Sequence, residues 1–456
     1  MKKILIFLLC ISLHASSQIV PSNTQYNQNI EWENVFTSGP EGKVNRGLVD
    51  SDGNCALVFM PNNMARVHKV DGNNGQLIWT KTLNNKVGFG ISEYYENGRV
   101  DYIVCGGSGT TQERWIARLN GDDGTIIWDK TYSNGANLYE FDGIRMTISA
   151  SDGYIYAAGF VNGDEAGTIF VVYAGQEVVM KIDPADGSEI WSNINLQSEY
   201  SIALVESSDG YIYSAGTEYE QDLKLTKLDK FGNHFWTRNI SSSEDIIPAD
   251  LAIDNDDNIY YGGHTGRSGA GDPFDYSCVK LDTDANVNWI KHYANPRGYS
   301  LNHIRNELYG IKIGNDGIYM FGGTGDEGNY SAVNPPFLPS DIWNGWVLQT
   351  DFNGNITRSD IFCQDQVNTA TEYGDLVNGG FVIFNDTDAQ GDTEVGVMKI
   401  INGSNTNYDL INSAQTIDKN QILKINFLGQ QLNQKSKRIF DVDKNGNIHK
   451  KIVLDY

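Results

Sequence analysis

The chain has 456 residues, of which 58 are acidic and 34 are basic, and its formal net charge is −24. A surface of this charge repels phosphate backbones, so the composition argues against a nucleic acid as partner. With 48 glycines, 24 tyrosines and only 10 prolines, the composition is typical of an all-β protein with many tight turns. We predict no cofactor, although the excess of carboxylates is compatible with calcium.

Residues 1–17 have the pattern of an export signal. A basic start, Met1-Lys2-Lys3, precedes an apolar run from Ile4 to Leu13, and small residues follow before Gln18. The apolar run is shorter than the ~20 residues that span a membrane, and no later segment is apolar enough to cross one. We therefore expect cleavage near Gln18 and a mature protein without an integral membrane segment, secreted or displayed on the outer cell surface.

One phrase recurs about every fifty residues in the first two thirds of the chain. A basic residue is followed by an apolar residue and by Asp or Asn, and a Trp comes nine or ten positions after the basic residue. The phrases span 69–79, 118–128, 181–191, 227–236 and 280–289, and they end in Trp79, Trp128, Trp191, Trp236 and Trp289. Repetition at this period indicates a solenoid, a propeller or an array.

A second phrase precedes the first in each unit. Residues 151–159 and 208–216 show it most clearly, as Ser-Asp-Gly-Tyr-Ile-Tyr-x-Ala-Gly. Asp-Gly and Asn-Gly pairs supply the positive φ angles of a tight hairpin turn, and alternating residues then form a strand. The terminal glycine indicates a crowded place without room for a side chain. We count seven such turns, at Gly53, Gly98, Gly153, Gly210, Asn258, Gly317 and Gly379.

Each unit is therefore predicted to be a four-stranded antiparallel meander, which is the blade of a β-propeller. We predict an all-β fold with a propeller at residues 18–410 and seven blades; six and eight blades are the alternatives. A spare Trp strand at residues 29–36 would close the ring if it pairs into the last blade. The Trp strand is degraded in the sixth unit, at residues 351–356, and in the seventh, at residues 399–408.

The Asp-x-x-x-Gly-x-x-x-Trp phrase resembles the repeats of pyrroloquinoline-quinone-type propellers, and the resemblance extends over residues 30–410. That family includes quinone dehydrogenases as well as scaffold and binding propellers without enzymatic activity. The resemblance implies that the five Trp residues dock between neighbouring blades and are structural. A quinone dehydrogenase would need axial calcium ligands and a catalytic Asp, and no such set is recognisable here. The chain also lacks the common zinc, serine-hydrolase and phosphate-loop motifs, so we name no catalytic or metal-binding residue.

The sixth unit breaks the rhythm with a long insertion between Gly325 and Gly345. Irregular insertions on a rigid scaffold often carry function. Aromatic side chains beside acids could stack on a sugar and hydrogen-bond to it. The candidate ligand-binding residues are Tyr330, Phe337, Asp341 and Trp343. The alternative is that these aromatic residues pack under the loop as a small core of their own.

Residues 415–456 are predicted to form a separate small β-domain. A strand at 421–428 ends in a Gly turn, and two further alternating strands flank an Asn-Gly turn. The segment resembles the type A C-terminal sorting domain of proteins that the type IX secretion system of Bacteroidota exports. The matching residues are Lys424, Leu428, Gly429, Gly446, Lys450 and Lys451, whereas the Pro common in the family's middle stretch is missing. The resemblance implies that the secretion machinery is a partner; the alternative is a β-domain with no targeting role.

Four cysteines remain after removal of the signal, namely Cys55, Cys105, Cys278 and Cys363. They show no metal-type pairing such as Cys-x-x-Cys. Three of them lie inside apparent strands, which favours buried thiols that act as small apolar side chains. One disulfide is the alternative in an oxidising compartment.

Together these patterns predict a non-enzymatic binding module. It would be exported by the type IX route and would bind a glycan or a cell-surface protein through loops on one propeller face. The alternative is an enzyme that uses the propeller axis, either a polysaccharide-active hydrolase or lyase or a degenerate quinone-type oxidoreductase. Three or more acids or histidines converging on the axis would favour the enzyme.

Overall fold

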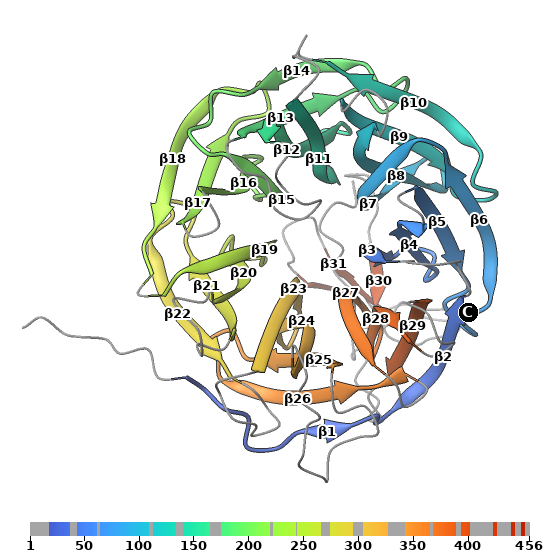
Figure 1. The fold of residues 1–456 in the computed structure, drawn as a ribbon, viewed down its shortest axis with the longest axis vertical. Coiled ribbons are helices and arrows are strands. Elements are labelled where there is room, and N and C mark those ends of the chain that lie inside the picture. Colours follow the sequence, from blue (N-terminus) through green and yellow to red (C-terminus); the bar gives the residue numbers. More distant parts are fainter. Residues whose placement is uncertain are drawn as a thin grey trace, which may run out of the picture. The chain divides into compact units, whose positions relative to one another are not determined.

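Residues 18–401 form a ring of seven β-sheets arranged around an axis, as the repeats predicted (Figure 1). The computed structural model describes residues 18–36, 43–61, 64–108, 113–133, 140–164, 175–218, 222–242, 244–265, 274–294, 304–326, 343–364, 368–388 and 394–401, and three short strands near the C-terminus. The chain divides into two compact units, Met1–Ile411 and Asn412–Tyr456. No helix in the described part of the chain is long and apolar enough to cross a membrane.

Each of the seven sheets contains an antiparallel blade of four strands, and in blades 1 to 6 the four strands follow chain order. Blade 1 contains β3 (Val44–Val49), β4 (Cys55–Phe59), β5 (Ala65–Val70) and β6 (Leu77–Leu83). Blade 2 contains β7 (Lys86–Glu96), β8 (Arg99–Ser108), β9 (Arg114–Asn120) and β10 (Ile126–Tyr132). Blade 3 contains β11 (Glu140–Ser149), β12 (Ile155–Asp164), β13 (Gln176–Ile182) and β14 (Glu189–Asn193). Blade 4 contains β15 (Tyr200–Glu206), β16 (Ile212–Glu218), β17 (Asp222–Leu228) and β18 (His234–Ile240).

The remaining three blades complete the ring. Blade 5 contains β19 (Ile246–Ile253), β20 (Ile259–Thr265), β21 (Tyr276–Leu281) and β22 (Val287–Tyr293). Blade 6 contains β23 (Ile304–Gly314), β24 (Gly317–Asp326), β25 (Trp343–Thr350) and β26 (Ile356–Phe362). Blade 7 takes three strands from the end of the propeller, β27 (Thr369–Val377), β28 (Gly380–Thr387) and β29 (Glu394–Ile401), and its fourth strand, β2 (Ile30–Phe36), from the start.

The N-terminal strand closes the ring. β2 pairs antiparallel with β29, and the register runs from Ile30 opposite Ile400 to Phe36 opposite Val395. This is the role that the spare Trp strand at residues 29–36 was predicted to have. A further short strand, β1 (Gln25–Tyr26), pairs in parallel with β26 and covers the outer edge of blade 6.

Every first strand carries a β-bulge. At the bulge, the backbone of the first strand comes so close to the second strand that a glycine is needed there in most blades. The extra residues are Asn45, Phe89, Arg145, Ile202, Ala249, Tyr309 and Glu372. In five blades a glycine of the second strand faces the residue before the bulge. A side chain at Gly159 would come within 2.0 Å of the Gly143 carbonyl, and one at Gly263 within 2.2 Å of the Ile247 carbonyl. The crowding that the repeated glycine indicated therefore comes from the blade's own first strand.

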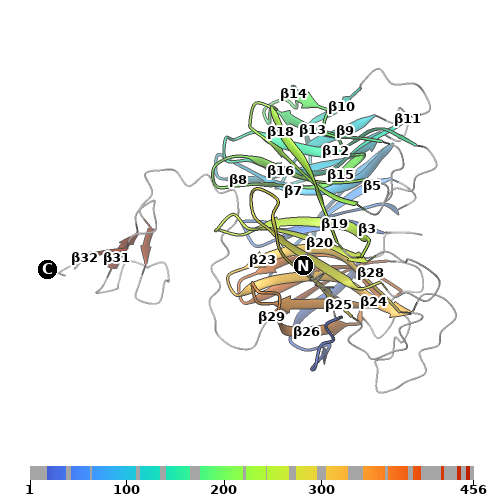
Figure 2. The ribbon, with the colours of Figure 1, turned by 90° about the vertical axis from the view of Figure 1, so that its left-hand side faces the viewer.

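The antiparallel order gives the propeller two different faces (Figure 2). The turn face carries the connections from first to second and from third to fourth strands. The loop face carries the connections from second to third strands and from each blade to the next. The first-to-second turns take positive φ at the predicted glycines, for example Gly53 at 84° and Gly210 at 86°. In blade 5, Asp257 (φ 61°) takes this conformation and not Asn258, the position that the sequence pattern indicated.

The C-terminal unit contains a three-stranded antiparallel sheet. Its strands are β30 (Leu423–Ile425), β31 (Ile439–Val442) and β32 (Ile448–Lys451). Lys424, Lys450 and Lys451, which the sequence resemblance assigns to a sorting signal, lie in these strands, and Lys450 is opposite Phe440. Leu428, Gly429 and Gly446 lie outside the described residues.

Candidate functional site

Most of the predicted ligand-binding insertion lies outside the described residues, including Tyr330, Phe337 and Asp341. Trp343 is the exception, because it is the first residue of β25 and lies opposite Gly325. Its side chain is half-buried, and a Cβ at Gly323 would lie 2.5 Å from its Nε1 atom. The indole of Trp343 thus packs on the backbone of its own blade, at the loop-face end.

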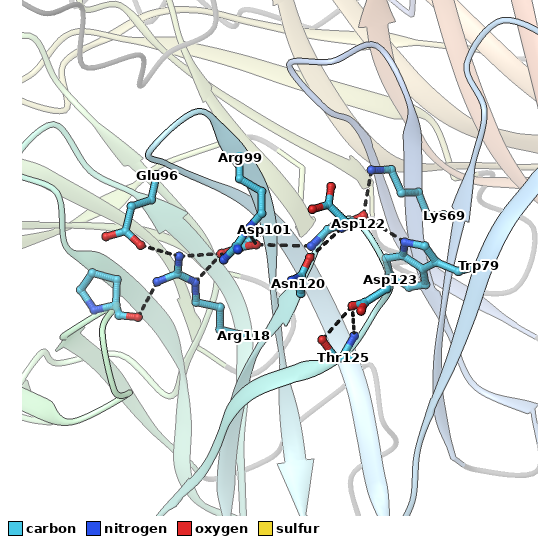
Figure 3. Close-up of polar contacts among 12 residues, drawn as sticks. Lys69, Trp79, Glu96, Arg99, Asp101, Arg118, Asn120, Asp122, Asp123 and Thr125 are labelled. Carbon is cyan, nitrogen blue, oxygen red and sulfur yellow. Dashed lines mark hydrogen bonds and ion pairs between the residues drawn. The ribbon is translucent and has the colours of Figure 1, made fainter.

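The five repeat Trp residues lie at the junctions between blades, on the turn face. In every repeat phrase the Trp is the direct cross-strand neighbour of the basic residue, as in Lys69 opposite Trp79. Both side chains therefore point toward the same turn of the neighbouring blade. Trp79 Nε1 and Lys69 Nζ donate to the Gly121 carbonyl at 3.0 and 2.9 Å. Figure 3 shows this junction and, beyond it, Arg118 at the next one.

The same arrangement, in which the basic side chain and the Trp indole donate to one backbone carbonyl, occurs at four consecutive junctions, and we call it the clamp. Its acceptor is always the carbonyl of the residue after the Asp or Asn that begins the third-to-fourth turn. Arg118 and Trp128 both donate to the Pro184 carbonyl at 2.8 Å. The other two clamps join Lys181 and Trp191 to the Lys230 carbonyl, and Lys399 and Trp32 to the Gly72 carbonyl. The motif that the sequence repeats is therefore a device that joins neighbouring blades.

The remaining three junctions depart from this clamp. Between blades 4 and 5 the equivalent carbonyl, that of Thr283, accepts from the Tyr213 hydroxyl at 3.1 Å. Between blades 5 and 6 the Trp289 Nε1 atom is buried without a hydrogen-bond partner in the described part of the chain. Blade 6 has Gln349 opposite Arg358 where the others have a basic residue opposite Trp. The weakened Trp strand of the sixth unit corresponds to this last change.

An ion pair crosses the innermost layer of the propeller. Arg46 of blade 1 binds Asp250 of blade 5, with Nη2 2.5 Å from Oδ1, although blades 6 and 7 separate the two along the ring. Tyr373 of blade 7 accepts from Arg46 and donates to Asp250, both at 2.6 Å. Burial lowers the pKa of Arg46, but the charge of Asp250 and the contacts with Tyr373 outweigh it, so the net pKa is raised. Each ion is therefore paired and hydrogen-bonded, as buried charges must be.

Three carboxylates gather near the loop face, two on the first strands of blades 6 and 7 and one on the second strand of blade 7. They are Glu307 on β23, Glu372 on β27 and Asp386 on β28. Burial, and then the charges of Asp386 and Glu307, raises the pKa of Glu372 well above its usual range. Burial also raises the pKa of Asp386, even though its Oδ1 atom accepts from the Val44 amide at 2.7 Å. Sequence reasoning could not select these acids from the 58 in the chain, because three separate strands bring them together.

A depression of about 470 Å³ opens between blades 3 and 4, with its lining at loop-face ends of the strands. The lining residues are Gln176, Ile194, Asn195, Gln197, Ser198, Glu199 and Lys224. Lys224 Nζ donates to the Gln197 carbonyl at 2.9 Å, which fixes the ammonium at the edge of this depression. No sequence motif marks these residues, since the connection from β14 to β15 supplies most of them.

A buried acid lies directly beside this depression. Glu177, the neighbour of Gln176 in β13, is fully buried and accepts from Ser214 Oγ at 2.5 Å and Thr226 Oγ1 at 3.0 Å. Burial raises the pKa of Glu177 to about 8, against the opposing effect of these two hydroxyl groups. Burial therefore favours the protonated form of this carboxyl group.

The cysteines are buried free thiols, as the first of the two interpretations predicted, and none is in a disulfide. Burial raises the pKa of Cys105 to about 12, and that of Cys55 and Cys278 also rises. Among the described residues, no group of three His, Cys, Asp or Glu side chains is placed to hold a metal ion.

The antiparallel blades, the clamp between them and the N-terminal closing strand define a seven-bladed β-propeller with PQQ-like repeats. The profile of the family described as outer membrane protein assembly factor BamB matches residues 63–306, which is more than half of the chain. The chain therefore belongs to this family. Among curated proteins, no sequence matches the chain significantly.

Three solved structures that match the chain have low sequence identity to it. The WD40 β-propeller domain of Doa1 is 13% identical with a TM-score of 0.48, over 81% of this chain and 96% of that chain. The β-propeller domain of Myceliophteria thermophila Cps50 (Swd1) is 10% identical with a TM-score of 0.48, over 82% and 99%. A protein of unknown function from Bacteroides caccae is 9% identical with a TM-score of 0.38, over 68% and 93%.

Proposed function

We propose that this protein is an exported binding module that holds a glycan on its loop face. The observation that carries the proposal is the depression between blades 3 and 4, whose lining offers amide, hydroxyl, carboxylate and ammonium groups. These groups match the hydroxyl pattern of a sugar, which both donates and accepts hydrogen bonds. The irregular connections of the propeller share this face, and loops on a rigid scaffold commonly bind ligands.

The turn face supports the proposal by contrast, because its polar groups serve its own turns. The Asp or Asn that begins each third-to-fourth turn accepts from the backbone amide two residues later. The acceptors are Asp71, Asn120, Asp183, Asp229, Asp282 and Asp351, at 2.8 to 2.9 Å. A face built in this way leaves few of its acceptors for a ligand.

A glycan array probed with the full chain tests the proposal. Where a glycan binds, Asn195→Ala and Glu199→Gln should each weaken it at least tenfold, and Asn73→Ala on the turn face should leave it unchanged. Trp343→Ala tests whether the insertion contributes as well. Equal affinity in both depression variants and the wild type would refute the depression as the binding site.

We further propose that residues 415–456 direct export through the type IX secretion system and lead to display or release at the cell surface. The support is the sequence resemblance together with the small three-stranded sheet that carries Lys424, Lys450 and Lys451. Deletion of residues 415–456 should leave the protein in the periplasm, as measured by cell fractionation. Normal export of the truncated protein would contradict the assignment.

The carboxylates near the axis favour a second candidate function, a polysaccharide-active hydrolase or lyase. Glu372 would be the proton donor, because burial and neighbouring carboxylates raise its pKa. Release of reducing ends or unsaturated products from a polysaccharide panel tests this function. Glu372→Gln should abolish the activity, and Asn73→Ala should retain it; no product from any polysaccharide would exclude this candidate for the panel.

A further inference from the structure

A second arginine lies in the innermost layer of the propeller, and it lacks the partners that Arg46 has. Arg145 is the bulge residue of β11 in blade 3 and is only 9% exposed. Its guanidinium lies 4.5 Å from the ring centre of Phe89, on the first strand of blade 2, and 5.6 Å from that of Phe160 in its own blade. Aromatic rings therefore occupy the space beside the ion.

Two of the three guanidinium nitrogens of Arg145 have unsatisfied hydrogen-bond donors. Its Nε and Nη2 atoms are buried and have no acceptor among the described residues. These two atoms lie on the same edge of the planar guanidinium, where their N–H bonds form the fork that binds a carboxylate with two parallel hydrogen bonds. The orphan donors are thus an adjacent pair that one planar anion would satisfy.

No carboxylate among the residues that the structure describes compensates the charge of Arg145. Burial lowers its pKa to about 10, and only Tyr200 and Cys105 act in the opposite direction. The group therefore stays charged at neutral pH. Contact with aromatic rings stabilises a cation, but it leaves in-plane N–H donors without acceptors, and buried donors are rarely left so.

Arg46 shows how this fold treats an arginine in the same layer when no ligand is needed. Asp250 and Tyr373 approach its Nη2 atom, and the ion pair is complete within the protein. For Arg145 the described part of the chain supplies two aromatic rings and no acid. A cation retained in such a place is best explained by an anion that comes from outside the chain.

We propose that Arg145 binds the carboxylate group of a small ligand between blades 2 and 3, in the innermost layer of the propeller. The anion approaches along the edge that carries Nε and Nη2, and Phe89 and Phe160 contact the apolar part of the ligand. The ligand class is a carboxylate, either a simple organic acid or an acidic sugar. This site is separate from the loop-face depression and does not depend on it.

The test uses the full chain with sodium acetate or sodium glucuronate as probes, against sodium chloride at the same ionic strength. Acetate should raise the melting temperature of the wild type in a saturable way. Arg145→Met, which keeps an apolar side chain between the rings, should remove this effect and should be at least as stable as the wild type in chloride. Arg145→Lys, which keeps the charge but not the fork, should bind acetate at least tenfold more weakly.

Nitrogen-15 spectra of the arginine Nε–H groups give a readout on the wild type that does not depend on variants that fold. Acetate should shift the Arg145 signal, and the Arg46 signal should stay unchanged because the Arg46 guanidinium is already paired with Asp250 through Nη2. Glucuronate binding at least tenfold tighter than acetate would identify an acidic sugar, and equal affinity would identify a simple carboxylate. Wild-type protein that does not respond to either probe in melting or in spectra would overturn the proposal, as would an equal acetate effect in Arg145→Met.

Discussion

The junction between blades 2 and 3 differs from the junction between blades 5 and 6, although the same sequence phrase builds both. At the first, Arg118 and Trp128 both donate to the Pro184 carbonyl. At the second, Lys280 lies 5.3 Å from the centre of the Tyr260 ring, and Trp289 Nε1 is buried without a partner among the described residues. In both blades the basic residue and the Trp are direct cross-strand neighbours, so the pair itself has not changed.

A second tie, closer to the turn glycine, is present at both junctions. The Tyr132 hydroxyl donates to the Gly187 carbonyl at 2.8 Å, and the Tyr293 hydroxyl donates to the Gly354 carbonyl at 2.9 Å. Each of these tyrosines comes four residues after the repeat Trp. A junction therefore has two separable parts, the indole hydrogen bond and the tyrosine hydrogen bond. The indole hydrogen bond can be absent while the ring remains closed.

Removal of the indole at the first junction should have the largest effect. Trp128 is 7% exposed, so Trp128→Ala should cost about 3–5 kcal/mol through lost burial and the cavity left behind. Its neighbour Ile127 is 40% exposed, and Ile127→Ala should change the stability by less than about 0.5 kcal/mol. Urea unfolding followed by tryptophan fluorescence and by circular dichroism measures both. Equal midpoints for the two variants would show that the clamp does not hold the ring.

The regular parts of the molecule were predictable from the sequence because local rules set them. The Asp-Gly turns, the alternating strands and the closing strand at residues 29–36 follow from turn chemistry and periodicity, and the seven blades follow from their count. The phrase also located Trp128 and Trp289 equally well. It could not distinguish them, because their hydrogen bonds depend on a turn in the next blade.

The candidate sites were far less predictable. Arg145 and Glu372 occupy equivalent bulges in different blades, and a bulge is a matter of strand register that the residue pattern does not show. The depression at Asn195 and Glu199 comes from a connection without a motif. The site that the sequence did single out, at Tyr330, Phe337 and Asp341, lies outside the described residues and stays a prediction.

A methyl group added at the turn glycine of each junction, Gly187 or Gly354, should change the free energy of unfolding by less than Trp128→Ala does, and by different amounts at the two junctions. Gly187 has a φ of 75° and Gly354 one of 73°, so alanine is strained at both positions by about 1 kcal/mol. At Gly187 the new Cβ would lie 2.6 Å from the Trp128 ring, whereas at Gly354 it would meet the flexible side chain of Lys291 at 2.7 Å and the Tyr293 hydroxyl at 2.9 Å.

Gly187→Ala should therefore cost about 2–3 kcal/mol and Gly354→Ala about 1 kcal/mol. The difference between their urea midpoints measures how much the contact between the new methyl group and the rigid Trp128 ring destabilises the first junction. A Gly354→Ala variant as unstable as Gly187→Ala would mean that strain in the turn, and not the packed indole, dominates at both.

The smallest expected effect is that of Trp289→Phe at the second junction, and its comparison with Trp128→Phe at the first junction isolates the indole hydrogen bond. Trp128→Phe removes the donor that binds the Pro184 carbonyl at 2.8 Å, so it should lose about 1–2 kcal/mol from that bond in addition to the smaller ring. Trp289→Phe removes a buried donor without a partner among the described residues, and the gain from this removal should offset much of the lost packing. We therefore expect Trp289→Phe to be within about 0.5 kcal/mol of the wild type in urea unfolding. Equal losses in the two variants would mean that Trp289 makes a hydrogen bond in solution and that the two junctions are alike.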